Sequence, residues 1–484
     1  MRKIFISSLV IMNLGGCQVK DRQEQANENF KLDGDGFDRT ALLSNLALHV
    51  VIPKIEKAVS SAQSLTETLE LSCGAPAPEN RGRAQAAWKT LMKDWQHLEA
   101  FQFGPVAEDG YTLRNKIYSW PNINRCNIDK EVLNNVNRNI VLSQHDSRKG
   151  LGALEYLLFT ETLDHSCGDS IGGLEPWVDL SNEERIFNRC RYALAVSVDL
   201  KAQLKDLEDR WSRDESGYSQ VMIQAETYEQ QQSILNKISD SLFYLDQEVK
   251  DVKLGAPIGL SDRCKAASCP EFVEFSYSKT SLDALLANLQ GFQAIFDGRF
   301  FDDPTPLTKI FALNDNLPLV DIEVNPLTAE DELWTLKAGE NNLYSVEGSR
   351  QSEKSKEAKH GQDYDNGSIK FKWLVNSKFP EPGTIYQFKV TITRPGFDEY
   401  LRQIQQVSLA ARMKSHIEAA VDQAKAMAKS GSLHQMVQNS CDDASDESPC
   451  SLHRNIKKVT DDLKSEFINA LELKMPRRAS GDND

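Results

Sequence analysis

The chain has 484 residues and a formal net charge of −15, from 71 acidic and 56 basic residues. A surface of this sign repels phosphate backbones, so the composition argues against a nucleic-acid partner. Nowhere is the sequence apolar for the roughly 20 residues that a membrane-spanning helix needs, so no transmembrane anchor is expected.

The first residues have the pattern of a secretory signal peptide. Arg2 and Lys3 precede an apolar run over residues 4–14, which is too short to span a bilayer as a permanent helix. The run ends in Leu14-Gly15-Gly16-Cys17, which is similar to the lipobox, whose cysteine is acylated and becomes the mature N-terminus. The alternative is an ordinary secretory signal that is followed by an incidental cysteine.

This pattern predicts a signal peptide over residues 1–16, lipid on Cys17 and a flexible polar tether over 17–38. The lipid would attach the exported chain to a membrane. Gln18 stands where an aspartate would favour retention in the inner membrane. The expected location is therefore the outer membrane, on its periplasmic face or at the cell surface.

From residue 39 to 299, apolar residues recur at three- and four-residue spacing, which predicts helices. The expected helices cover residues 39–71, 81–103, 130–160, 182–214, 220–254 and 281–296. Helices of this length with short connections are typical of antiparallel bundles. The helical pattern returns within 396–475, at 397–429 and 452–473, and a polar tail follows over 476–484.

Residues 300–395 differ in sequence pattern, because the three- and four-residue apolar spacing is lost and β-branched and aromatic residues become frequent. The strand-like runs are 319–324, 333–336, 369–374 and 386–392. Turn-forming residues separate them, so a small β-sandwich-like insert is expected. Residues 352–366 are charged and poor in apolar residues, which predicts a mobile loop within the insert.

Eight cysteines remain besides Cys17, and an even number in an exported chain favours disulfides. They are Cys73, Cys126, Cys167, Cys190, Cys264, Cys269, Cys441 and Cys450. Short separations favour the pairs Cys264–Cys269 and Cys441–Cys450, while Cys167–Cys190 and Cys73–Cys126 are plausible loop closures. The sequence leaves the connectivity open.

Several segments, in their order along the chain, resemble the imelysin-like family of helical envelope proteins. The residues that carry the resemblance are Ala87-Trp88, Trp95-Gln96, Phe103-Gly104-Pro105, 117–121, 150–159, 253–259, 281–291 and 481–484. The family's members are often iron-regulated and are sometimes classed as metallopeptidases. The resemblance implies a mainly α fold of two helical bundles, each of the four-helix type, with a cleft between them.

The resemblance also implies a Gly-x-His-x-x-Glu motif, whose His and Glu lie one helical turn apart and can share a metal or a substrate group. Gly150 and Glu155 occupy its ends, but Gly152 stands at the histidine position. Glu155 remains the best candidate for a metal ligand, with iron or another divalent metal as the possible cofactor. A hydrolytic zinc site needs several such ligands, so a binding role is favoured over a peptidase.

Four residues are candidates for ligand binding in the cleft. Glu155 has apolar neighbours and needs a partner inside the bundle, so it either contacts a ligand or forms a structural pair. Glu99 and Asp246 either converge on the same cleft or are solvated surface charges. Trp120 either fills the core or forms a wall of the cleft. Lys253 either pairs with a carboxylate or lies on the surface, and the surface is the preferred interpretation.

The expected function is a non-enzymatic binding or accessory component in the uptake of iron or of an iron-bearing ligand, working with envelope uptake proteins. Oxygen ligands suit hard ferric iron, and an acidic surface does not oppose cation capture. Two alternatives remain open. One is a metal-dependent peptidase at the cell surface, and the other is a scaffold that holds another envelope protein through the β-rich insert.

Overall fold

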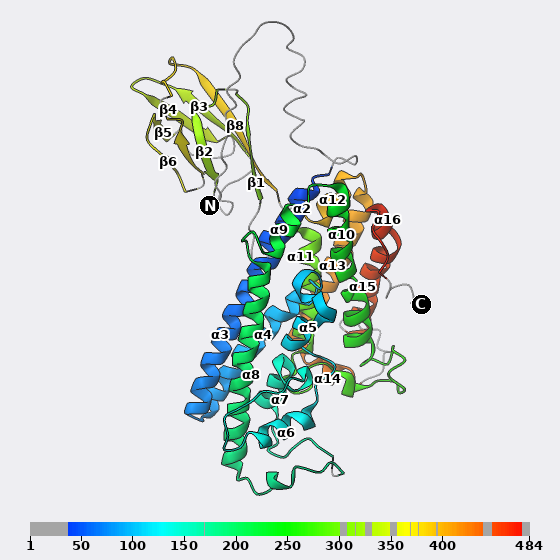
Figure 1. Cartoon of the computed structure of the whole chain (residues 1–484). Coiled ribbons are helices and arrows are strands. Elements are labelled where there is room, and N and C mark those ends of the chain that lie inside the picture. The colour runs from blue at the N-terminus through cyan, green and yellow to red at the C-terminus, as the bar shows by residue number, and fades with distance from the viewer. Residues whose placement is uncertain are drawn as a thin grey trace. The chain divides into compact units, whose positions relative to one another are not determined.

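The computed structural model describes residues 37–168, 170–300, 307–314, 316–324, 332–348, 356–367, 369–375, 377–393, 395–438 and 448–476 (Figure 1). The expected signal peptide, Cys17, Cys441 and all but one residue of the expected C-terminal tail lie outside these residues, as does the expected tether up to residue 36. The described chain is mostly helical with a small antiparallel β region, which confirms the expected fold class.

Two compact units make up the chain. One combines the described residues up to Asn45 with those of 301–395, and the other combines 46–300 with the described residues from 396 onward. Among its described residues, the first unit contains one helix, α2 (Arg39–Asn45), whose start is capped by the Asp38 carboxylate, 2.9 Å from the Ala41 amide. The other described elements of this unit are the strands of the β region.

The helical unit contains the α-helices α3 Ile52–Gly74, α4 Pro78–Leu98, α5 Glu108–Ile117, α6 Arg125–Asn134, α7 Gly150–Phe159, α8 Asn182–Trp211, α9 Tyr218–Ile223, α10 Tyr228–Leu242, α11 Ser281–Asp297, α12 Phe397–Gln403, α13 Val407–Ser430, α14 Leu433–Met436, α15 Pro449–Asp462 and α16 Ile468–Ala470. Wider π turns form η1 Leu46–Val51, η5 Leu245–Gly255 and η7 Leu463–Phe467. Tighter single turns form η2 Gly104–Val106, η3 Asp146–Arg148, η4 Glu175–Trp177 and η6 Pro270–Phe272. Among the residues described, no helix has both the length and the apolar content needed to cross a membrane.

Two groups of helices build this unit. In the first, α3 packs lengthwise against α4 and α8, and α7 packs against α8 and α4 (Figure 1). In the second, α11 packs against α13 and η5, while α15 packs against α13 and η5. The groups meet where α11 crosses α4, since a Cβ at Gly291 would lie only 2.3 Å from the His97 carbonyl oxygen. A glycine is therefore required for this close approach.

Apolar spacing explains the first group. The stripe of α3 that is buried comprises Ile55, Ala58, Ala62, Leu65 and Leu69, at three- and four-residue intervals. The helix α8 begins with a capping box, in which Ser181 and Glu184 satisfy each other's backbone amides. Trp88 of α4 is fully buried, and its Nε1 donates to the Leu151 carbonyl of α7, 3.0 Å away.

The expected single helix over 130–160 is wrong. The helix α6 ends at Asn134, and α7 begins only at Gly150. Gly150 has φ +72°, and a Cβ there would lie 2.6 Å from the Ile117 carbonyl oxygen, so the chain turns tightly into α7. The asparagine-rich segment after α6 has no apolar stripe to extend the helix.

The β region contains β1 Leu307–Ala312, β2 Leu319–Val324, β3 Glu332–Ala338, β4 Leu343–Gly348, β5 Lys356–Lys359, β6 Tyr364–Asp365, β7 Ile369–Trp373 and β8 Ile385–Thr393. All pairs are antiparallel, in one sheet of order β1-β8-β3-β4-β5 and a second of order β2-β7-β6. Alternate residues of both sheets share one core, in which Tyr344 stacks on Trp373 at 4.7 Å.

The expected loop over 352–366 contains two strands in its described part, so that prediction is wrong there. β5 pairs with β4, and β6 pairs with β7. Each contributes one buried residue: Ala358 is 3% exposed, and Tyr364 stacks on Phe371. When only one small or aromatic residue of a strand faces the core, a charged composition gives no sequence signal for that strand.

Three disulfides are present among the described residues: Cys73–Cys190, Cys126–Cys167 and Cys264–Cys269. The last confirms the predicted local pair, whereas the predicted Cys167–Cys190 and Cys73–Cys126 pairs are wrong. The packing of α3 against α8 brings the end of one helix beside the start of the other, across 117 residues of sequence. Cys450 is disulfide-bonded, but its expected partner Cys441 lies outside the described residues.

Candidate functional site

Glu155 lies on α7 and faces the segment that precedes α11. Its Oε1 accepts hydrogen bonds from the Tyr277 amide (3.2 Å), the Ser278 amide (2.9 Å) and the Ser278 hydroxyl (3.0 Å). The residue is 7% exposed. Burial raises the pKa of Glu155 to about 7, although the hydrogen bonds from Ser278 and Tyr277 act in the opposite direction. This carboxyl group therefore connects α7 to Tyr277 and Ser278, in the segment that precedes α11.

At the histidine position of the expected motif, the space next to the backbone is occupied by Ile123. A Cβ at Gly152 would lie 2.5 Å from Cδ1 of Ile123 and 2.6 Å from its Cγ1. The β-branched isoleucine side chain thus fills the space beside Glu155 that a histidine would need.

The metal site that the family motif implies does not fit these residues. One oxygen of Glu155 already accepts three hydrogen bonds, and Ile123 is not a ligand. In the part of the chain that the structure describes, no group of three or more His, Cys, Asp or Glu side chains could hold a metal ion. A structural zinc or iron site needs such a group.

Beside Glu155 lies a cavity of about 280 Å³ with aromatic, cationic and acidic walls. The residues that line it are Tyr118, Trp120, Pro121, Ile123, Arg125, Gly152, Glu155, Tyr156, Val252, Ala256, Arg263, Glu271, Phe272, Val273, Glu274 and Tyr277. Trp120 is half-buried and forms a wall of the cavity rather than filling the core. Arg125 lies over the Tyr277 ring, 4.8 Å from its centroid, so one cation sits directly at an aromatic wall.

Behind this wall lies a buried lysine, so the surface assignment of Lys253 is wrong. Lys253 is 1% exposed, and its Nζ donates to Gln96 (2.6 Å) and Asn288 (3.0 Å). It also forms an ion pair with Glu274, 3.1 Å from Oε1. The lysine thus joins α4, η5, α11 and the segment before α11, and it holds one acidic wall residue of the cavity in place.

The pKa values of Glu274 and Glu99 shift in opposite directions although both residues are buried. Burial raises the pKa of Glu274, against the opposing influence of Lys253 and of the Tyr118 hydroxyl, which donates to Oε1 at 2.7 Å. Burial also acts on Glu99, but Arg114 and Lys253 together lower its pKa below the usual value. Oε2 of Glu99 accepts from Arg114 (3.0 Å) and Tyr244 (2.5 Å).

The four sequence candidates therefore do not converge on one place. Glu155 and Trp120 line the cavity together. Glu99 is outside the lining but connected to it, because Arg114 also donates to the Trp120 carbonyl at 3.3 Å. Asp246 is fully buried elsewhere and pairs with Lys250 (3.2 Å) and Lys464 (2.8 Å).

Sequence reasoning missed Glu274 and Arg125. Glu274 is an acidic residue between Val273 and Phe275, a pattern that signals a buried carboxylate in need of a partner. For Arg125 the sequence carries no such signal, since it is one exposed arginine among many. Only the packing of α6 beside α7 brings it to the cavity.

Glu155→Gln is expected to remove a pH dependence of stability. The folded pKa of Glu155 lies near 7, above its ordinary value of 4.5. Its contribution to the free energy of unfolding is therefore fully present below pH 4.5, falls as the pH rises from 4.5 to 7, and is lost above pH 7. The loss amounts to roughly 3 kcal/mol. Urea unfolding between pH 4 and pH 8.5 measures it, and the glutamine keeps an Oε1 acceptor for the three donors.

The matched control for this prediction is Glu161→Gln, which changes an exposed carboxylate just beyond the same helix. It should keep the wild-type decline between pH 4 and pH 8.5. An equal decline in the Glu155→Gln protein would contradict the prediction.

Comparisons with known proteins agree on one family. The imelysin family model, peptidase M75, matches residues 51–340, more than half of the chain. Iron-regulated protein A of Synechococcus elongatus is 26% identical over 322 residues, which cover 64% of this chain and 80% of the relative.

Two solved structures are similar along most of their length. An imelysin-like protein from Psychrobacter arcticum has a TM-score of 0.53 at 15% identity, covering 90% of this chain and 96% of that one. An iron-regulated protein A precursor from Parabacteroides distasonis has a TM-score of 0.51 at 13% identity, covering 90% and 93%. At these identities the likeness establishes the fold alone.

Proposed function

This chain belongs to the imelysin family, and from that premise we propose that it is a non-enzymatic, envelope-anchored lipoprotein that binds an iron-bearing organic anion in the cavity beside Glu155. Its relationship to iron-regulated protein A of Synechococcus elongatus supports a role connected with iron. The chemistry of the cavity supports the choice of an organic chelate over a bare ion.

The observation that carries this proposal is the replacement of the motif histidine. With Ile123 in the space beside Gly152, the cavity offers aromatic faces and arginines where a metal site would offer imidazole. Arginine binds carboxylate and catecholate oxygens through directed hydrogen bonds, and aromatic walls bind flat organic groups. A negatively charged iron chelate satisfies both features. Arg125 and Arg263 supply positive charge, and burial raises the pKa of Glu155 and Glu274, which weakens the repulsion from two of the three carboxyl groups that line the cavity.

Arg125→Gln is expected to weaken binding of a ferric 2,3-dihydroxybenzoate complex about tenfold, because one charge-assisted hydrogen bond is lost. Quenching of tryptophan fluorescence measures the binding, since Trp120 lines the cavity. Arg138→Gln, an exposed arginine outside the lining, is the matched control and should bind as the wild type does.

Two results would contradict this function. One is equal affinity of the Arg125→Gln and wild-type proteins for the chelate. The other is stoichiometric binding of ferrous or ferric ion by itself, measured by elemental analysis after gel filtration, because that result requires a ligand set at the metal.

The anchor and location are part of the same proposal and rest on residues 14–17. Acylation of Cys17 would hold the chain at the outer membrane, on its periplasmic face or at the cell surface, beside envelope uptake proteins. Labelling of cells with radioactive palmitate tests this anchor. Incorporation should be lost in Cys17→Ser, and labelling that survives the substitution would exclude lipid attachment at this cysteine.

A further inference from the structure

A second cavity, of about 360 Å³, lies within the first helical group and is largely apolar. It is bounded by the end of α3, the start of α4, the end of α7 and the start of α8. The residues that line it are Leu69, Ser72, Cys73, Pro76, Ala77, Pro78, Arg81, Leu157, Leu158, Thr160, Leu163, Ile186, Phe187, Arg189, Cys190 and Ala193. The cavity of the proposed function shares none of these residues.

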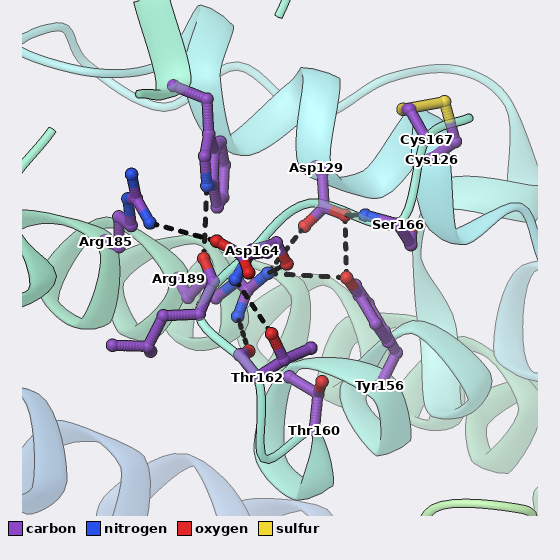
Figure 2. Close-up of polar contacts among 12 residues, drawn as sticks. Cys126, Asp129, Tyr156, Thr160, Thr162, Asp164, Ser166, Cys167, Arg185 and Arg189 are labelled. Carbon is purple, nitrogen blue, oxygen red and sulfur yellow. Dashed lines mark hydrogen bonds and ion pairs between the residues drawn. A yellow bond between two sulfur atoms is a disulfide. The ribbon is translucent and has the colours of Figure 1, made fainter. Parts of the chain in front are cut away.

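The walls of this cavity are fixed by covalent and polar bonds. The Cys73–Cys190 disulfide forms part of the lining. Figure 2 shows Arg189 reaching the segment after α7, where it donates to the carbonyls of Thr162 (2.6 Å) and Asp164 (2.8 Å). Its charge is balanced by Asp129, 3.2 Å away. The cavity is therefore preformed, and Arg189 is not available to a ligand.

The acceptor Asp129 is itself held by the same segment. Its Oδ2 accepts from the Tyr156 hydroxyl (2.6 Å) and from the amide and hydroxyl of Ser166 (2.8 and 3.0 Å), next to the Cys126–Cys167 disulfide (Figure 2). This network secures the wall that carries Thr160 and Leu163.

Arg81, an exposed residue that lines the cavity, brings a positive charge to it. Its guanidinium donates to the carbonyls of Leu158 (3.0 Å from Nη2) and Thr160 (2.8 Å), both of which are neutral acceptors. Among the described residues, no carboxylate pairs with Arg81, and no acidic residue lines the cavity. In a chain of net charge −15, an arginine without a carboxylate partner favours an anion at this place.

Thr160 supplies a second polar group, independently of that charge. The residue is 4% exposed and lines the cavity, and its Oγ1 is buried with no hydrogen-bond partner in the described part of the chain. A buried hydroxyl without a partner costs free energy, which a ligand oxygen would recover. Since Arg81 hydrogen bonds the Thr160 backbone, the charge and the hydroxyl belong to one small polar corner.

We propose that this cavity binds a free fatty acid, with the alkyl chain along Leu69, Leu157 and Ile186 and the carboxylate at Arg81 and Thr160. The two oxygens of a carboxylate match one guanidinium and one hydroxyl. The volume lies near the lower end of the range for small-molecule pockets, about 300–1,000 Å³, so it suits one alkyl chain better than the two chains of a phospholipid. Together, an apolar lining and a single cationic corner select an amphiphile over a sugar or a metal ion.

Dodecanoate is the probe for this proposal, with the full chain and isothermal titration calorimetry. One molecule should bind per chain, and dodecanol should bind at least fivefold more weakly because it lacks the charge. Arg81→Gln should reduce the affinity for dodecanoate to that for dodecanol, while Arg83→Gln, which changes an equally exposed arginine outside the lining, should not. Thr160→Val should lower the affinity for dodecanoate about threefold.

Blocking variants keep the test independent of folding. Ala77 lines the cavity and is half-buried, so Ala77→Trp should abolish binding, whereas Ala75→Trp, exposed and outside the lining, should not. Circular dichroism confirms that both variants are folded. The proposal is overturned if dodecanoate does not bind, if Ala77→Trp binds it as the wild type does, or if Arg81→Gln leaves the preference over dodecanol unchanged.

Discussion

Lys253→Met is expected to lower the free energy of unfolding by about 3–5 kcal/mol, because it leaves a buried carboxyl group without its cation. The substitution keeps the length of the apolar stem but removes the cation that pairs with Glu274 at 3.1 Å. It also leaves Gln96 and Asn288 without their shared donor, inside a fully packed region. Urea denaturation followed by circular dichroism measures the loss.

A second substitution tests whether the buried charge is the cause. In Lys253→Met combined with Glu274→Gln, no carboxylate remains unpaired at this place, so part of the stability should return. Lys237→Met, an exposed lysine on α10, should stay within about 0.5 kcal/mol of the wild type. A loss below 1 kcal/mol for Lys253→Met would show that the ion pair is not a stabilising contact.

Removal of the Cys73–Cys190 disulfide is expected to cost about 5 kcal/mol. The bond closes a loop across 117 residues, and the entropy that a crosslink removes from the unfolded chain grows with the length of the loop. The same relation gives only about 2 kcal/mol for Cys264–Cys269, which are five residues apart.

The paired variants Cys73→Ala/Cys190→Ala and Cys264→Ala/Cys269→Ala provide the comparison. Both remove two sulfur atoms, so the difference of about 3 kcal/mol isolates the effect of loop length. Thermal unfolding of the three proteins measures it. Equal losses in the two variants would contradict an entropic origin of the stabilisation.

What the sequence determined by itself are the features that depend on near neighbours. The three- and four-residue spacing of Trp88, Leu91 and Trp95 predicts the buried face of α4, and alternation predicts β7 and β8. The Cys264–Cys269 pair follows from its short separation. These predictions succeed because hydrophobic period and short loop closure act over a few residues. The order of the family's segments likewise predicted the imelysin membership that the comparisons establish.

Only the tertiary structure decided which side chains meet. Lys253 has an ordinary sequence context, yet it is buried because Glu274, Gln96 and Asn288 converge on it from distant segments. The same holds for Ile123, which occupies the space beside Gly152. It also holds for Cys190, which lies beside Cys73 because α8 packs against α3. Contacts between residues far apart in the chain depend on how whole helices pack, and local patterns carry no record of that packing.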